Sequence, residues 1–218
     1  MYMKKIELLA PAGNMEKLKF AFMYGADACY IGGRDYSLRA NAKNFSIDEI
    51  REACSYAHNL GKKVYVTVNI VFHNEDAQGL TNYLKELAVA KVDAIIVSDP
   101  FVIHIINKNN IDLKVHISTQ ASTLNIESVM LWKGLGVERV VLAREASCEE
   151  IKEIIDKTGM EIETFVHGAM CSSYSGRCVL SNYFTNRDAN RGGCAQICRW
   201  EVPLYDSNMN KIESETLF

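Results

Sequence analysis

Short apolar runs alternate with amphipathic segments along residues 6–166 of this 218-residue chain. The apolar runs have the composition of buried strands, and the segments between them repeat apolar residues at helical spacing. Strands are expected at residues 6–10, 28–31, 63–70, 94–98, 114–118, 139–143 and 161–166, and helices at residues 15–24, 46–60, 80–90, 100–107, 126–135 and 148–158. This alternation predicts an α/β fold, with a parallel sheet covered by helices.

Seven such units favour a (β/α)-barrel of the TIM type over a dinucleotide-binding fold. No Gly-x-Gly-x-x-Gly motif follows the first strand, so the second fold has no support beyond the alternation. TIM barrels have eight units in about 250 residues, and here an eighth strand would have to come from residues 201–205 or be absent. We expect residues 1–167 to form the barrel units and residues 168–218 to form a cysteine-rich segment that closes the C-terminal face of the same domain.

The composition is that of an ordinary globular protein. Its net charge gives no overall electrostatic attraction to RNA or to a membrane. The net charge of −3, from 24 basic and 27 acidic residues, is small. The chain begins without the long apolar run of a secretion signal, so we expect a cytoplasmic protein with no membrane partner. Locally, residues 168–200 contain one acid, Asp188, and four arginines: Arg177, Arg187, Arg191 and Arg199. These arginines could bind phosphates or could offset the charge of nearby thiolates.

Four of the seven cysteines lie within 28 residues: Cys171, Cys178, Cys194 and Cys198. A disulfide framework is disfavoured in a reducing cytosol. Packing as small hydrophobes suits Cys29, Cys54 and Cys148, but not the late four, which lie among Gly, Ser, Arg and Asn. Neighbouring thiolates are best stabilised by a shared metal ion or cluster. The C-x3-C pair suits zinc, and the wider spacings are tolerated by iron–sulfur clusters, so spacing alone leaves both open.

Polar residues are expected at the rim of the barrel, because functional groups gather where barrel strands end. The candidates are Asn69, Asp99, Gln120, Arg144, Glu145 and His167. Each has a structural alternative, such as capping a helix, bonding a neighbouring loop or forming a rim ion pair. Together they predict a polar, partly cationic pocket that the cysteine-rich segment, residues 168–218, covers.

One run of residues has the form of a family signature. It is Glu163-x-Phe165-x-x-Gly168-Ala169-Met170-Cys171, followed by Ser175-Gly176-x-Cys178-x-Leu180-Ser181. This run resembles the signature of the peptidase U32 family, the collagenase-like proteases. Further similar stretches are residues 9–13, 66–69, 118–120, 142–145 and 198–200. They extend through nearly the whole chain, so the resemblance is specific at the level of the family.

The resemblance implies an enzyme that hydroxylates an RNA base, because family members include hydroxylases of a tRNA wobble uridine, an rRNA cytidine and ubiquinone precursors. Some are linked to prephenate as a small-molecule oxygen donor, and several hold a four-cysteine [4Fe–4S] cluster. Here Cys171, Cys178 and Cys194 would be ligands, with Cys198 or a downstream cysteine as the fourth. Arg144, Glu145, His167 and Gln120 are the candidate catalytic residues that would hold the donor or the base. Since family members continue well past residue 218, we expect an N-terminal portion of a longer protein.

Two other functions stay open. A peptidase would need a zinc site or a nucleophilic thiol such as Cys171 beside His167, since His-Glu-x-x-His and Gly-x-Ser-x-Gly are both absent from the sequence and its histidines are dispersed. A non-catalytic partner subunit would use a cluster only to relay electrons. The sequence carries no signal for the oligomeric state.

Overall fold

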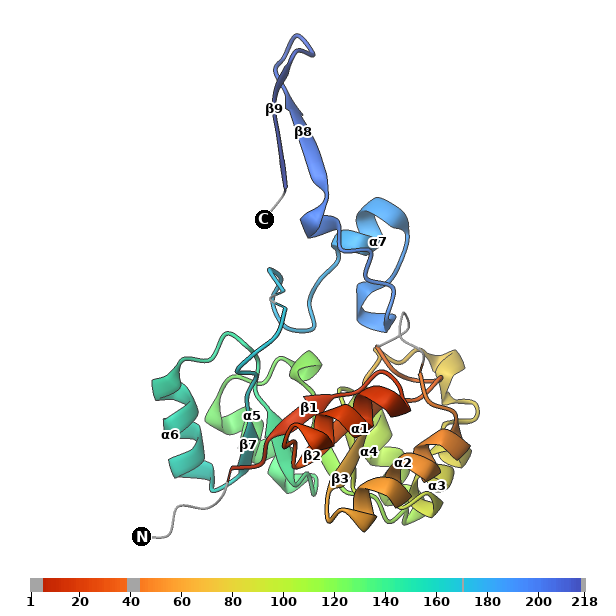
Figure 1. The fold of residues 1–218 in the computed structure, drawn as a ribbon. Helices are drawn as coiled ribbons and strands as arrows, with labels where there is room; N and C mark the ends of the chain where they lie inside the picture. The colour runs from red at the N-terminus through yellow and green to blue at the C-terminus, as the bar shows by residue number, and fades with distance from the viewer. Residues whose placement is uncertain (1–5, 39–43, 170, 217–218) are drawn as a thin grey trace.

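Seven parallel strands form one sheet whose order follows the sequence. The computed structural model describes residues 6–38, 44–169 and 171–216. The strands are β1 (Leu9–Pro11), β2 (Ala28–Gly32), β3 (Lys63–Val68), β4 (Ala94–Val97), β5 (Val115–Ile117), β6 (Arg139–Val141) and β7 (Glu161–Glu163). Each strand pairs with the next along the chain. The predicted α/β fold of the (β/α)-barrel type is therefore confirmed, in the form of an open, barrel-like sheet (Figure 1).

Six helices connect these strands, close to their expected positions. They are α1 (Met15–Met23), α2 (Ile47–Asn59), α3 (Leu80–Val89), α4 (Pro100–Asn109), α5 (Ile126–Gly134) and α6 (Cys148–Thr158). Ser46 and Ser147 open α2 and α6 with the expected capping boxes, and the side chain of Asn14 caps α1. Asp99, a candidate rim residue, caps α4 by accepting from the Phe101 N–H at 2.9 Å. None of the helices in the described ranges has the length and apolar character needed to cross a membrane.

Strand residues alternate between two packing environments. In β3, Val64, Val66 and Val68 are fully buried in the main core, with the apolar faces of the helices. Tyr65 points to the other side and belongs to a smaller cluster that includes Ala94. The helices therefore cover the outer face of the sheet, and the inner face holds its own packed layer, as in a barrel.

A buried arginine joins the two edges of this sheet. In the described ladder the edge strands are β1 and β7. Arg139 opens β6, is 5% exposed, and donates to Glu161 at 3.0 Å and to Glu163 at 3.2 Å, both in β7. It also donates at 2.8 Å to Glu7, just before β1. Side chains thus connect the two edge strands, through carboxylates that Arg139 shares.

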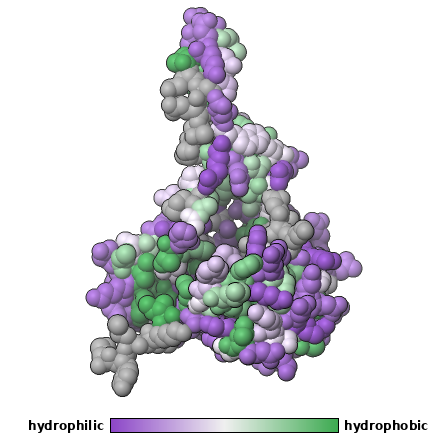
Figure 2. All heavy atoms as spheres, in the orientation of Figure 1, coloured by the Kyte–Doolittle hydropathy of each residue, from purple (hydrophilic) through white to green (hydrophobic). Residues whose placement is uncertain are grey.

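One patch of exposed hydrophobic side chains lies over α5, α6 and β7. Figure 2 shows apolar side chains gathered over the region of α5, α6 and β7. The exposed apolar residues of α5 include Met130 and Leu131, and α6 contributes Ile155. Leu8, next to β1, is half exposed as well. The apolar surface therefore lies near the open edge of the sheet.

The chain leaves the sheet after β7 and ends in a projecting hairpin (Figure 1). β7 stops at Glu163, three residues earlier than expected, and Val166 is 87% exposed. After α7 (Leu180–Thr185) come β8 (Glu201–Tyr205) and β9 (Lys211–Thr216), which pair with each other in antiparallel fashion.

Of the two alternatives for an eighth barrel strand, residues 201–205 or none, the described part of the chain has the second: its sheet has seven strands, and residues 201–205 pair elsewhere. Asp206 accepts hydrogen bonds from the N–H groups of Asn208 and Asn210, both at 2.8 Å, and so closes a tight turn. This turn brings β9 beside β8 at once. Parallel pairing with β7 would instead need a long crossover connection.

Removing the charge of Arg139 is expected to destabilise the fold strongly. In Arg139→Met, Glu7 and Glu163 would lose their common partner, and breaking a buried ion pair costs about 3–5 kcal/mol. Urea unfolding followed by circular dichroism measures this loss. Arg51→Ala is the control, because the Arg51 side chain is 51% exposed and its ion pair is with Asp48, which lies in the same helix turn and is also exposed. Its loss should stay below about 1 kcal/mol, and equal losses in the two variants would contradict a stabilising role for the network.

The same cluster predicts a loss of stability in acid. Burial alone would raise the pKa of Glu7, but hydrogen bonds from Arg139, Lys63 and Tyr65 outweigh it and lower the pKa from 4.5 to about 2. Because the folded-state pKa lies below the unfolded one, this contribution is fully present above pH 4.5 and disappears as the pH falls toward 2. Burial raises the pKa of Glu163, so that residue acts in the opposite direction.

Glu7→Gln should accordingly flatten the decline of the unfolding free energy between pH 4.5 and 2. Urea unfolding at a series of pH values measures the slope. A variant as acid-sensitive as the wild-type protein would rule out Glu7 as a source of the decline.

Candidate functional site at the C-terminal ends of the strands

Polar side chains cross-link the C-terminal ends of β3, β4 and β5. The hydroxyl oxygens of Ser37 and Thr67 lie 2.7 Å apart, and both residues are buried. Asn69 donates from Nδ2 to Ser118 Oγ at 3.4 Å, and its carbonyl accepts from Ser98 Oγ at 3.0 Å. The predicted rim residue Asn69 thus ties neighbouring strand ends together.

Ser175 anchors the cysteine segment, residues 171–199, to the rim between β5 and β6. The residue is fully buried. Its N–H donates to Glu145 Oε1 at 2.9 Å, and its Oγ accepts from the Arg144 N–H at 3.3 Å. From the loop after β5, Ser122 Oγ donates to the Ser175 carbonyl at 2.6 Å. Two separate loops therefore hold one residue of the segment.

Gly176 lies close against the backbone of Gln120. Its φ is +71°, and a Cβ at this position would lie 2.1 Å from the carbonyl oxygen of Gln120. A side chain here would force the two backbones apart, so only glycine fits without a shift. Gln120 lies in the short 3-10 turn Thr119–Ala121 after β5, which Ser118 caps. The Ser-Gly pair of the signature is therefore a docking motif.

Arg144 and Glu145 contact the segment from the loop after β6. The Arg144 guanidinium donates to the Ser173 carbonyl at 3.3 Å. Partial burial would raise the pKa of Glu145, but hydrogen bonds from Ser175 outweigh it, so the pKa is lowered. Glu145 is therefore a carboxylate at neutral pH and serves the docking contact as an acceptor.

Three of the four predicted catalytic residues meet at this contact. They are Gln120, Arg144 and Glu145, and each touches the Ser173–Gly176 stretch through its side chain or backbone. The fourth, His167, is exposed on the connection between β7 and the segment. Gln120, Arg144 and Glu145 thus lie under the segment and support its backbone, whereas His167 is accessible to solvent.

A second anchor joins the segment to the loop after β3. Arg191 donates to both carboxylate oxygens of Asp76, at 2.5 and 2.9 Å, and to the Val71 carbonyl at 2.6 Å. The hydrogen bond from Arg191 is the main cause that lowers the pKa of Asp76 to about 2. The Val71 N–H in turn donates to the Asn190 carbonyl at 3.0 Å. The segment is therefore held at both β3 and β6, across the C-terminal ends of the strands between them.

Sequence reasoning did not identify Ser175 or Asp76 as anchors. Ser175 stood in the signature, where the neighbouring glycine was a usable signal for close backbone approach. Asp76 lay in a polar loop without any such signal, because its partner Arg191 is 115 residues away.

The thiols of the segment are free but are not gathered at one point. Cys171 and Cys194 are exposed, and Cys178 and Cys198 are partly buried. Among the residues that the structure describes, no three His, Cys, Asp or Glu side chains are close enough to hold one metal ion. Four thiols suit a soft metal or a cluster chemically, but their arrangement here does not form such a site.

The three remaining cysteines differ in burial: two are buried and one is exposed. Cys29 and Cys54 pack as buried small hydrophobes, as expected, and burial raises the pKa of each thiol to about 12. Cys148, for which the same role was expected, is exposed. It is the first residue of α6, next to the Ser147 cap, where the helix end faces solvent.

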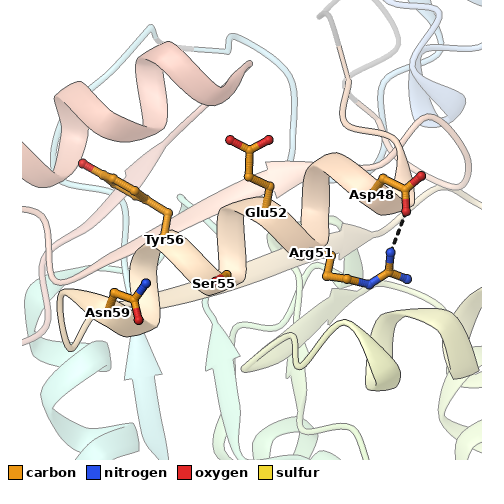
Figure 3. Close-up of a pocket in the computed structure, with 6 residues that line it drawn as sticks. All are labelled: Asp48, Arg51, Glu52, Ser55, Tyr56 and Asn59. Carbon is orange, nitrogen blue, oxygen red and sulfur yellow. Dashed lines mark hydrogen bonds and ion pairs between the residues drawn. The ribbon is translucent and has the colours of Figure 1, made fainter.

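A surface depression lies along α2, away from these contacts. Figure 3 shows its six lining residues on one side of the helix, with Arg51 paired to Asp48. They are Asp48, Arg51, Glu52, Ser55, Tyr56 and Asn59. None of them is a predicted site residue, and none takes part in docking the cysteine segment.

Comparison with known proteins finds relatives over almost the whole chain. The chain matches peptidase family U32 over residues 13–217. It is 56% identical over 205 residues to the tRNA hydroxylation protein P1 of Bacillus subtilis (strain 168), covering 94% of this chain and 49% of that protein. It is 45% identical over 211 residues to the tRNA hydroxylation protein P of Escherichia coli (strain K12), covering 96% and 47%. The chain thus spans about half the length of these curated relatives.

A solved structure shares the fold. The U32 peptidase Mk0906 superposes with a TM-score of 0.61 at 16% identity, covering 75% of this chain and 71% of that one. This likeness agrees with the barrel-like sheet and concerns the fold alone. By the match to the family over residues 13–217, this chain belongs to the peptidase U32 family.

Proposed function

We propose that this chain is the barrel-like part of an enzyme that hydroxylates an RNA base. The support from sequence is the high identity, 56% and 45%, to two proteins named for tRNA hydroxylation. A uridine of tRNA is therefore the proposed target, ahead of a cytidine of rRNA. The reaction would take place in the cytoplasm.

The docking of the cysteine segment on the strand ends carries the proposal. Catalytic groups of (β/α)-barrels gather at the C-terminal ends of the strands. The two anchors, Ser175 and Arg191, hold the segment across this face. This arrangement supports a base-binding place at these strand ends, under the thiol-bearing backbone. Gln120, Arg144 and Glu145 would position the segment, and His167 would contact the base or the oxygen donor.

Hydroxylation replaces a hydrogen on the base by a hydroxyl group and removes two electrons from the base. The reaction therefore needs an oxygen source, for which a small molecule such as prephenate is proposed, and a separate two-electron oxidant that takes up the electrons released by the base. An iron–sulfur cluster would supply electron-transfer chemistry when bound. We propose Cys171, Cys178, Cys194 and Cys198 as its candidate ligands, with zinc as the alternative. The four thiols would have to come together from the positions seen here, while the two anchors stay in place.

Nucleoside analysis tests the activity. In a bacterial host whose own U32 relatives have been deleted, expression of the protein should produce a tRNA nucleoside with one added oxygen atom. Digested tRNA and rRNA would be analysed separately by liquid chromatography and mass spectrometry. Gly176→Ala should lower the yield on the order of 100-fold. The added Cβ would push the backbones of Gly176 and Gln120 apart, and a misplacement of about 1 Å at an active site can cost about 100-fold in rate.

Gly134→Ala is the matched control for Gly176→Ala. Gly134 ends α5, and a Cβ there would meet nothing within 4 Å. This variant should keep the wild-type yield. If neither RNA pool gains an oxygen atom while the purified protein cleaves gelatin, the hydroxylase proposal is wrong and the peptidase alternative replaces it.

Metal analysis tests the cofactor. Protein prepared without oxygen should contain iron and acid-labile sulfide and absorb broadly in the visible range. Cys171→Ser should lose this absorbance, whereas Cys148→Ser should keep it, because Cys148 is an exposed thiol on α6, outside the cysteine segment. Stoichiometric zinc without iron would contradict the cluster and favour the zinc alternative.

A further inference from the structure

Exposed aromatic rings are concentrated in and around the cysteine segment. Six of the eight large aromatic residues that are exposed in the described part of the chain lie between residues 165 and 205. They are Phe165, Tyr174, Tyr183, Phe184, Trp200 and Tyr205. Large exposed apolar groups that gather in one region mark a binding surface more often than single ones do.

Two of these rings form a pair on a firmly held helix. Tyr183 and Phe184 lie on α7, are 84% and 56% exposed, and meet edge to face with ring centroids 5.1 Å apart. The backbone beneath them is fixed by Ser181, whose buried Oγ accepts from the Ala195 N–H at 2.9 Å. The last turn of α7 is stabilised by Thr185, whose Oγ1 donates to the Ser181 carbonyl at 2.7 Å. The rings thus point into solvent from a backbone that is held in place.

Positive charge accompanies these rings. Arg177 and Arg187 flank α7 and are both exposed. Arg191, by contrast, is paired with Asp76. The one acid of residues 168–200, Asp188, accepts from the Asn190 N–H at 2.8 Å as the cap of a short turn. In a chain whose net charge is −3, this surface is therefore locally cationic.

We propose that Tyr183, Phe184, Arg177 and Arg187 form a platform on which unpaired bases of an RNA loop stack. Rings that stack on bases and arginines that contact the backbone are the combination by which proteins bind single-stranded RNA. The platform lies between the barrel-like sheet and the β8–β9 hairpin (Figure 1). Bases held there would place a neighbouring base at the C-terminal ends of the strands. This inference rests on the proposed function, since it names how that RNA is held.

Ring substitutions distinguish base stacking from an apolar protein contact. The probe is a fluorescently labelled RNA hairpin with an unpaired, uridine-containing loop, compared with a fully paired RNA of the same length at one salt concentration. Tyr183→Leu keeps the apolar area but removes the ring, and should weaken hairpin binding by roughly five-fold or more. Tyr183→Phe keeps the ring and should bind like the wild-type protein. Tyr24→Leu is the control, because Tyr24 is 85% exposed at the end of α1, outside the platform.

An arginine substitution tests the phosphate contact separately. Arg187→Ala should weaken binding and lower the slope of log affinity against log salt by about one. Lys85→Ala is the control, since Lys85 is an exposed cation on α3. Equal salt slopes for Arg187→Ala and the wild-type protein would remove Arg187 from the platform.

Three results would overturn the platform: no binding of the hairpin by the wild-type protein, equal binding of hairpin and duplex, or wild-type affinity in Tyr183→Leu. An apolar protein contact would tolerate leucine and so gives the last of these results. Nucleoside analysis of the same variants separates the two proposals. If the wild-type protein and Tyr183→Leu both produce the hydroxylated nucleoside in equal yield, the platform is refuted and the proposed activity is supported. If no hydroxylated nucleoside forms but binding of the RNA loop depends on the Tyr183 ring, the platform is supported and the proposed activity is refuted.

Discussion

The shared ion pairs of Arg139 are the interaction on which this architecture depends. A parallel sheet that follows the sequence order has two edges, and here these are β1 and β7. Arg139 reaches Glu7 beside one edge and Glu161 and Glu163 in the other. Its side chain is 6% exposed, so a guanidinium without these carboxylates would be a buried, unpaired charge. The network therefore stabilises the curved form of the sheet, because it connects β1 to β7, two strands that do not pair with each other in the described ranges.

The curvature of the sheet determines what the cysteine segment can contact. The loops after β3, β5 and β6 offer backbone groups and carboxylates on the same face of the sheet, and the segment bonds to all three loops. Ser175 uses buried hydrogen bonds, Gly176 uses the absence of a side chain, and Arg191 uses a bidentate ion pair. Few contacts thus fix the path of a segment that has little regular structure.

The arginines of the segment have separate roles in this arrangement. Arg191 is used within the chain, where it fastens the segment to Asp76. Arg177 and Arg187 remain exposed beside the aromatic pair of α7. The sequence presents these residues as one basic cluster, but the structure separates an internal anchor from an outward cationic surface. In the proposed enzyme, the internal anchor would support the segment and the outward surface would hold RNA.

The sequence by itself determined the local structure and the family. Helices could be predicted because their signals are local: α6 runs from Cys148 to Thr158 as expected, since its capping box and its apolar period lie within the same stretch. The signature around Cys171 and Gly176 was likewise readable from adjacent residues.

Only the tertiary structure decided which polar residues share contacts. Arg139 and Glu7 are 132 residues apart, and Arg191 and Asp76 are 115 apart, so neither pairing leaves a local pattern. The same holds for Arg144 and Glu145, whose side chains meet the Ser173–Gly176 stretch about 30 residues downstream. Hydrogen bonds and ion pairs act over a few ångströms, and which groups come that close depends on how the whole sheet curves.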